Sequence, residues 1–175
     1  MVVETARLPC VREGHPTVEF AEFFRDEYPG LVRALYLLTT NLVEAEELAQ
    51  EAMARAYERW DRVSLMESPG GYVYRAAVNL NRKRLRHLAV RARRLLSFPR
   101  QASRSGPEER TELTAALASL PVRLREAFML VEWVGVSTEE AGRILGIKPA
   151  SVRSRIHRAR VLLRESLFEG GDGDE

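Results

Sequence analysis

Apolar residues recur at helical spacing along almost the whole chain, and no segment alternates as a half-buried strand does. The first such pattern places one apolar face on Val18, Phe20, Phe23, Phe24 and Tyr28. Leu31, Leu35 and Leu38 continue the spacing after Pro29, a residue that suits the first turn of a helix. No internal repeat stands out. The pattern therefore predicts an all-α fold, with a small helical bundle in each half of the chain.

The next predicted helix begins at Asn41, where Glu44 three residues later completes a capping-box spacing with Asn in place of Ser or Thr. We expect this helix to run to about Trp60 and to turn one side inward, made of Leu48, Ala52, Ala56 and Trp60. Trp60 is thus expected in the core. Residues 61–67 lack a sustained period, which predicts a loop.

A further helix is predicted to start at Ser68 and Pro69, an N-cap residue followed by proline at the first helical position. It should run from Tyr72 to about Leu88, with an apolar stripe and a basic end. Residues 97–107 are rich in Ser, Pro and Arg and cannot form a long regular element, so we interpret them as an extended linker between domains.

Two more helices are predicted after the linker, one from near Pro107 through Leu120 and one from Pro121 to about Val134. A helix-turn-helix follows. Ser137 and Glu140 form a capping box, Gly146 ends the first helix and Pro149 opens the second. The second helix turns Val152, Ile156, Ala159 and Leu163 inward and a small, polar and basic face outward. Such a face suits base edges in the major groove, with flanking arginines on phosphates.

The net charge of +2 hides two cationic segments. Residues 68–107 hold ten Lys and Arg and no carboxylate, and residues 141–164 hold seven Lys and Arg and no carboxylate. Two separated cationic segments predict two contacts with a polyanion. The alternative for each segment is a merely solvated helix face.

Several function classes find no support in the sequence. The single cysteine, Cys10, cannot form an internal disulfide, and the three histidines show no zinc-ligand spacing. No phosphate-binding loop and no nucleophile with a base is visible. There is neither a signal-peptide pattern nor an apolar run long enough for a membrane helix. We therefore expect a cytoplasmic protein that is not an enzyme and needs no cofactor and no small-molecule substrate.

The order of these segments resembles the extracytoplasmic-function (ECF) sigma factors of bacterial RNA polymerase, over residues 18–167. Residues 137–160 resemble the region that reads the promoter −35 element, residues 44–57 resemble the polymerase-binding helix, and residues 72–86 resemble the −10-recognition helix. The resemblance implies five segments: an N-terminal extension (1–17), region 2 (18–90), a linker (91–107), region 4 (108–168) and a disordered tail (169–175).

The resemblance also implies site residues and partners. The implied partner is core polymerase, through the clamp helices of its largest subunit and its flap. The residues that the resemblance assigns to polymerase binding are Glu47, Leu48, Gln50, Glu51 and Arg55. Recognition and melting of the −10 element would fall to Tyr72, Tyr74, Arg75, Asn79, Arg82, Lys83 and Arg86, with residues 61–71 as the pocket for a flipped base. The −35 element would meet Lys148, Ala150, Ser151, Arg153, Ser154, Arg155, His157 and Arg158. The usual regulator of the family is an anti-sigma factor.

Two positions depart from the pattern of many relatives, which carry Arg before the Asn of the −10 helix and Asp four residues after it. Here these positions are Val78 and Lys83, which leaves the −10 preference open. Two other functions remain as alternatives. One is a free-standing helix-turn-helix regulator with an N-terminal sensing or dimerising bundle, which binds DNA without polymerase. The other is an interaction protein that only sequesters a partner.

Overall fold

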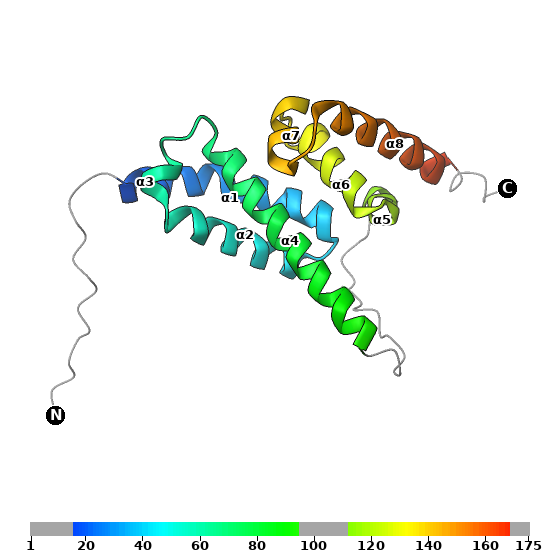
Figure 1. Ribbon diagram of the computed structural model, residues 1–175, viewed down its shortest axis with the longest axis horizontal. Coiled ribbons are helices and arrows are strands. Elements are labelled where there is room, and N and C mark those ends of the chain that lie inside the picture. The colour runs from blue at the N-terminus through cyan, green and yellow to red at the C-terminus, as the bar shows by residue number, and fades with distance from the viewer. Residues whose placement is uncertain (1–15, 95–111, 169–175) are drawn as a thin grey trace.

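The computed structural model describes residues 16–94 and 112–168, and every regular element in these two ranges is a helix (Figure 1). The predicted all-α fold class is thereby confirmed. Expectations about Cys10, most of the extension, most of the linker and the tail lie outside the described residues. The N-terminal unit consists of α1 (Pro16–Thr39), α2 (Leu42–Tyr57), α3 (Trp60–Val63) and α4 (Pro69–Arg94). The C-terminal unit consists of α5 (Glu112–Ser119), α6 (Val122–Phe128), the π-helix η1 (Met129–Trp133), α7 (Thr138–Leu145) and α8 (Pro149–Phe168).

Helix α1 is continuous through Pro29, so the expected helix start at this proline is wrong. Proline lacks the N–H that would bond to the carbonyl of Arg25. Pro29 lies on an exposed side of α1, where water can hydrate that carbonyl. Leu31 and Leu35, one turn apart on the opposite side, are 0% and 1% exposed and hold the helix to the core.

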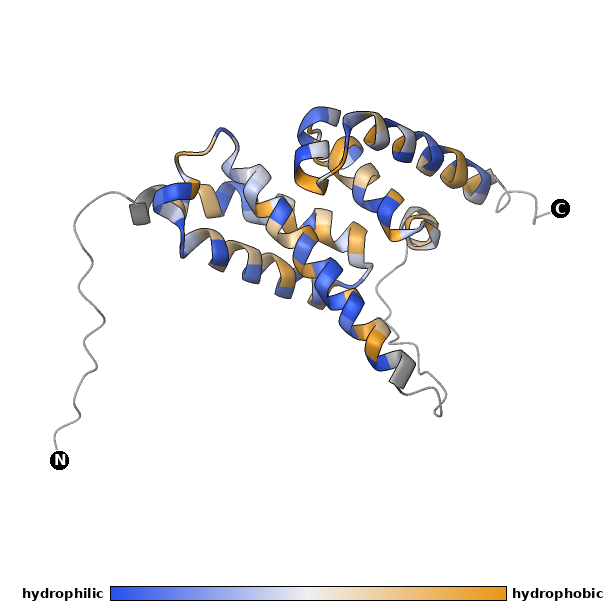
Figure 2. Cartoon of the chain, in the orientation of Figure 1, coloured by the Kyte–Doolittle hydropathy of each residue, from blue (hydrophilic) through white to orange (hydrophobic). Residues whose placement is uncertain are grey.

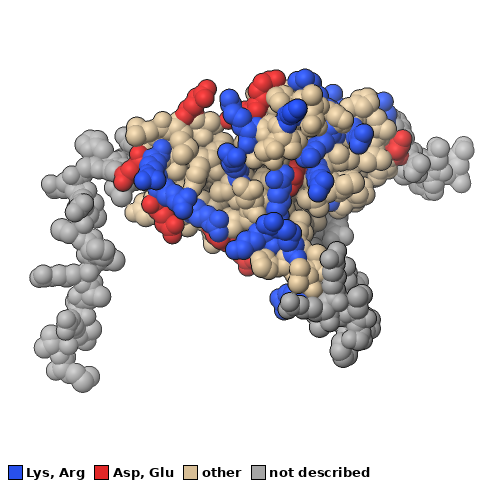
Figure 3. Space-filling model, in the orientation of Figure 1, with Lys and Arg blue, Asp and Glu red and all other residues tan. Residues whose placement is uncertain are grey.

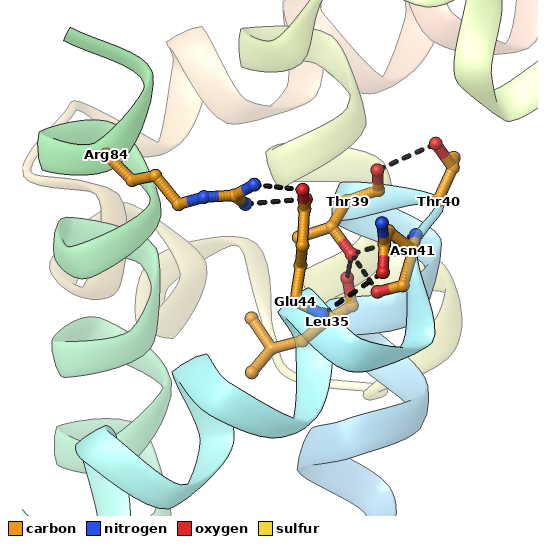
Figure 4. A network of polar contacts seen from close by, with 6 residues as sticks. All are labelled: Leu35, Thr39, Thr40, Asn41, Glu44 and Arg84. Carbon is orange, nitrogen blue, oxygen red and sulfur yellow. Dashed lines mark hydrogen bonds and ion pairs between the residues drawn. The ribbon is translucent and has the colours of Figure 1, made fainter. Parts of the chain in front are cut away.

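The turn between α1 and α2 shows why α2 begins where predicted (Figure 4). The side-chain oxygen of Asn41 accepts a hydrogen bond from the Glu44 N–H at 3.2 Å, which confirms the predicted N-cap. The Glu44 carboxylate does not bond back to Asn41. It pairs instead with the guanidinium of Arg84 on α4, and so ties the start of α2 to the middle of α4.

Helix α2 ends at Tyr57, and the segment expected to be a loop begins with the short helix α3. The helical turn places Trp60 and Val63 on the same side, where they are 6% and 0% exposed. Trp60 packs edge-on against Phe20, with ring centroids 5.1 Å apart, and its expected place in the core is confirmed. The prediction missed α3 because a single turn is too short to show a period.

Helix α4 begins at the predicted cap, where the Ser68 hydroxyl accepts a hydrogen bond from the Gly71 N–H at 3.0 Å. It extends beyond the predicted end at Leu88 to Arg94, and so includes the first four residues of the expected linker. Leu88 and Val90 are 45% and 47% exposed. The last turns of α4 therefore project from the bundle, which is why the apolar period fades there.

The helix predicted from Pro121 to about Val134 changes type at its midpoint. Regular α-helix ends at Phe128, and the π-helix η1 follows, with the Val134 N–H bonded to the Met129 carbonyl five residues earlier at 3.0 Å. The wider turn keeps Met129 and Leu130 buried side by side, at 1% and 0% exposure.

The two units pack directly against each other. One buried cluster contains Leu35 and Val78 from the N-terminal unit together with Leu130 and Ile144 from the C-terminal unit. A second cluster joins Leu37 of α1 to leucines and alanines of α5 and α8. Figure 2 shows that the helices carry hydrophobic and hydrophilic sides. The hydrophobic pattern of the sequence does not indicate this shared core.

Candidate nucleic-acid interface

The helix-turn-helix forms as predicted. The Ser137 hydroxyl accepts a hydrogen bond from the Glu140 N–H at 3.1 Å, and Gly146 ends α7 in the left-handed conformation, at φ 69°. The predicted inward residues of α8 (Val152, Ile156, Ala159 and Leu163) are all buried, at 0% to 7% exposure. The Glu140 carboxylate accepts a hydrogen bond from the hydroxyl of Ser68 in the other unit, at 2.5 Å.

Gly142 explains the tightness of the turn. A Cβ atom at this position would lie 2.8 Å from the carbonyl oxygen of Ile147, and the Ile147 N–H bonds to the Gly142 carbonyl at 3.0 Å. The glycine thus allows the chain after α7 to fold back against the helix before Pro149 begins α8. A glycine inside a helix destabilises it by about 1 kcal/mol relative to alanine. The close approach of the Ile147 carbonyl explains why glycine nevertheless occupies this position.

The outer face of α8 is open to solvent over most of its predicted site. Seven of the residues that the resemblance assigns to the −35 element are exposed: Lys148, Ala150, Ser151, Arg153, Ser154, His157 and Arg158. Arg155, the eighth, is half-buried. Arg153 lies 3.8 Å from Glu139 in an exposed ion pair, which contributes little to stability. The face can therefore approach DNA without unfolding any part of the unit.

The predicted −10 residues divide between an exposed row and the interior of the protein. Arg75, Asn79, Lys83 and Arg86 are exposed and follow one another at three- and four-residue spacing along one side of α4. Tyr72 is half-buried. In Figure 3, Lys and Arg side chains gather over α4, α7 and α8 on the face viewed. This exposed row has the composition that holds a nucleic-acid strand by its phosphates.

Tyr74 does not belong to that exposed row. Its side chain is 6% exposed and packs in the shared core, although Tyr74 is among the residues that line a cavity of about 560 Å³ between the units. Burial, and then the nearby charge of Glu27, raise the pKa of Tyr74 to about 12. The expected contact of Tyr74 with DNA is therefore not open in this conformation, because the spacing that puts it beside Val73 and Ala77 turns it inward.

Arg82 is held by the other unit. Its Nε and Nη2 donate to the two carboxylate oxygens of Glu126 on α6, at 2.8 Å and 2.6 Å, and its Nη1 donates to the carbonyl of Leu145 at 3.3 Å. Glu126 is 1% exposed. The hydrogen bond to Glu126 raises the pKa of Arg82. The expected −10 contact of Arg82 is thus occupied by a protein carboxylate.

Residues from both predicted DNA surfaces line one cavity of about 620 Å³ between α4, α6 and α8. From α4 it receives Asn79, Arg82 and Arg86, and from α8 it receives Arg155. Nη1 of Arg155 is buried and has no hydrogen-bond partner among the residues that the structure describes. The structure therefore brings the two predicted sites together, which the sequence did not indicate.

The predicted polymerase-binding face lies on the outer side of α2. Glu47, Gln50, Glu51 and Arg55 are exposed, and Glu51 pairs with Arg55 at 2.6 Å. Leu48 is different: it is 6% exposed and belongs to the core, because it lies one turn before Ala52 on the inward side. The expectation that Leu48 contacts polymerase is therefore wrong, because its side chain is buried.

Two residues at the contact between the units were not predicted from the sequence, namely Arg125 and Glu126 of α6. They are buried at 8% and 1% exposure. A signal was available, since Glu126 lies four residues after Val122 and four before Leu130, on an apolar stripe. A carboxylate on such a stripe needs a buried partner.

The described ranges contain no group of three or more His, Cys, Asp and Glu that could hold a metal ion. Among the helices that the structure describes, none is long and apolar enough to cross a membrane.

Two family models match the chain in succession. Residues 23–91 match the model of sigma-70 region 2, and residues 110–163 match the model of sigma-70 region 4. The RNA polymerase sigma-E factor of Streptomyces coelicolor is 31% identical over 153 residues, which cover 86% of each chain. The ECF RNA polymerase sigma factor SigW of Bacillus subtilis is 28% identical over 180 residues, which cover 92% of this chain and 95% of that protein.

A solved structure shares the fold. The sigma factor RpoE of Bartonella quintana, in complex with the anti-sigma factor NepR, superimposes with a TM-score of 0.75 at 22% identity, covering 86% of this chain and 97% of that one. At this identity the similarity shows the arrangement of helices.

Proposed function

The chain belongs to the extracytoplasmic-function sigma factors of the sigma-70 family, and we propose that its exposed helix faces divide the work of promoter-specific initiation. It is an alternative sigma factor that binds core RNA polymerase. Sigma factors are initiation factors without catalytic activity of their own, so the polymerase performs the chemistry. We propose that the protein acts in the cytoplasm, where polymerase and chromosome meet.

We assign recognition of the −10 element to the exposed row of α4, made of Arg75, Asn79, Lys83 and Arg86. This row is the single observation that best supports the proposal, since it joins cationic and amide groups on one helix side with no carboxylate among them. Cations hold the strand while amides and aromatic rings hold unstacked bases. Tyr72 lies beside the row, and Arg82 becomes available to DNA only when its pair with Glu126 breaks.

The −35 element is assigned to the seven exposed residues of the α8 face, together with Arg155. Arg158 and Arg153 can bond to guanine or phosphate, and the small side chains of Ala150 and Ser151 at the start of α8 allow close approach to base edges. The proposed modules are region 2 at 18–90 and region 4 at 108–168, joined by a linker at 91–107 whose first residues lengthen α4.

We assign the binding of core polymerase to the exposed face of α2, which contains Glu47, Gln50, Glu51 and Arg55. The proposed regulator is an anti-sigma factor, supported by the shared fold with a sigma factor solved in complex with one. Such a partner would bind in competition with DNA and polymerase.

Run-off transcription tests the proposal. Core polymerase with and without the protein is supplied with pooled genomic fragments, and discrete transcripts that require the protein are expected. The double variant Lys83→Ala, Arg86→Ala should lose most of these transcripts, whereas Arg25→Ala, which removes an exposed arginine of α1, should keep them. Absence of transcripts together with absence of co-elution with core polymerase would contradict the proposal.

A free-standing helix-turn-helix regulator is the second candidate. It predicts specific duplex binding without polymerase, usually as a dimer. Co-elution without any transcript would instead favour a protein that only sequesters its partner.

A further inference from the structure

The described conformation cannot contact both promoter elements at once. Asn79 and Arg155, from the proposed −10 and −35 surfaces, line the same cavity. The two elements are named for positions 25 base pairs apart, which corresponds to about 85 Å along the DNA at about 3.4 Å per base pair. The units must therefore separate before the protein engages a promoter, and the contacts between them oppose that separation.

The most specific of these contacts is the ion pair of Arg82 with Glu126. It is bidentate, at 2.8 Å and 2.6 Å, and it joins residues 44 positions apart on α4 and α6. The carboxylate is 1% exposed, while the Arg82 side chain is 33% exposed. Within residues 16–94 and 112–168, the buried carboxylate thus pairs with one guanidinium of the other unit, and that guanidinium is a proposed DNA contact.

A phosphate group offers Arg82 the same fork-shaped partner as a carboxylate. Promoter DNA and Glu126 are then alternative occupants of one guanidinium. We propose that the Arg82–Glu126 pair is an intramolecular latch, in which Glu126 takes the place of a DNA phosphate and holds the protein closed until promoter DNA replaces it. The inference rests on the proposed function for the identity of the competitor.

The closed form also contains polar groups that opening would release. Nη1 of Arg155 and Nε of Arg125 are buried without hydrogen-bond partners in the described part of the chain. Buried donors without acceptors destabilise a conformation relative to one in which water reaches them. The latch consequently holds a conformation that is poised to open.

The first arm of the test measures opening without DNA or polymerase. Dyes at cysteines that replace two exposed residues, Glu58 directly after α2 and Arg164 of α8, report the distance between the units by energy transfer in a Cys10→Ser background. Glu126→Gln and Arg82→Gln are each expected to shift the population to longer distances. The matched control is Glu44→Gln, which breaks the Arg84–Glu44 pair on the same helix α4 but inside one unit. It should leave the distance unchanged.

The second arm measures the affinity of the full chain for single-stranded DNA with the −10 sequence found by transcription. Glu126→Gln should bind about tenfold more tightly, as expected for loss of a charged competitor. Arg82→Gln should lose that gain although it opens equally. A merely structural role would move both variants in the same direction.

The outcomes decide between the interpretations. Unchanged distances in both variants, with circular dichroism showing native helix content, would overturn the latch. Opening of both variants without tighter DNA binding by Glu126→Gln would overturn the competition. If Glu126→Gln does not fold, Arg82→Gln still reports opening from the other side of the pair. Failure of the proposed function would show as absence of transcription, while the distance measurement would still test the latch.

Discussion

Arg125 in α6 donates a hydrogen bond from Nη1 to the carbonyl oxygen of Leu38, near the end of α1, at 2.9 Å. Its Nη2 donates to the carbonyls of Ala118 and Leu120, at 2.6 Å and 2.9 Å. One buried guanidinium therefore satisfies carbonyls at the ends of α1 and α5 that have no partner within their own helices. Burial lowers the pKa of Arg125, which reflects the desolvation that these bonds offset.

Arg125→Met should lower the free energy of unfolding by about 3 kcal/mol, because buried carbonyls lose their donors. Urea denaturation with two spectroscopic probes measures the change. The neighbouring Arg123 is exposed, and Arg123→Met should stay within about 0.5 kcal/mol of the wild type. Equal effects of the two substitutions would contradict the role assigned to Arg125.

Gly142→Ala should destabilise the protein by roughly 1–3 kcal/mol, because the added Cβ would meet backbone rather than a flexible side chain. Binding to −35 DNA should weaken with it, since the turn sets the position of α8. Gly30→Ala is the matched control. Its Cβ would meet the Tyr74 hydroxyl at an ordinary 3.6 Å, so the helix should gain up to about 1 kcal/mol. Thermal unfolding of both variants should therefore give shifts of opposite sign.

Glu27→Gln should make stability less dependent on pH. Burial, and then the charge of Asp26, raise the pKa of Glu27 above its ordinary value of 4.5. The folded protein then holds this proton more tightly than the unfolded chain, so Glu27 lowers stability as pH rises from 4.5 through the folded pKa.

The Glu27→Gln variant should consequently unfold at a higher temperature than the wild type at neutral pH, by a few degrees at most, and the gain should vanish below pH 4.5. Melting curves across this range measure it. Glu22→Gln, at an exposed position of the same helix, reports the general effect of removing one negative charge from α1. A gain that is the same at every pH would contradict a raised pKa of the half-buried Glu27 carboxyl.

Glu47→Lys combined with Glu51→Lys should weaken binding to core polymerase by about tenfold or more, since the charge of the proposed α2 contact face would be reversed at two positions. The melting temperature should barely move, because the exposed Glu51–Arg55 pair contributes only about 0.3–0.5 kcal/mol. Fluorescence anisotropy with labelled protein measures the affinity. Glu22→Lys on α1 should bind as the wild type does, and equal losses would place the contact elsewhere.

Local chemistry accounts for the parts of the fold that the sequence predicted correctly. Asn41, Ser68 and Ser137 each cap a helix through a backbone N–H three residues later, and Gly146 adopts the left-handed conformation that ends α7. These signals need no knowledge of the rest of the chain. Helix α3 and the π-helix η1 were missed because buried side chains such as Trp60 and Met129 select them through tertiary packing.

In the candidate site, too, local patterns predicted some features correctly, while features that depend on tertiary packing were missed. Amphipathic spacing correctly separated the exposed face of α8 from its buried stripe and turned Leu48 inward. The family resemblance, by contrast, placed Leu48 and Tyr74 among the contact residues, although both are buried. It also gave no indication that Arg82 meets Glu126, because their pairing depends on how the units pack. Composition shows only that Arg82 is one of ten Lys and Arg residues in a segment without carboxylates.

Because α4 projects from the bundle and ends only at Arg94, the chain that remains between α4 and α5 is short, and its length limits which promoters the protein can serve. Helix α4 ends at Arg94 and α5 begins at Glu112, so the intervening residues 95–111 can span at most about 60 Å when fully extended. The distance over which the two helices proposed to read DNA can separate is thus bounded by the length of this segment rather than by either proposed recognition surface. Deletions in this segment should narrow the tolerated spacer between the two elements and leave the preferred base sequence of each element unchanged.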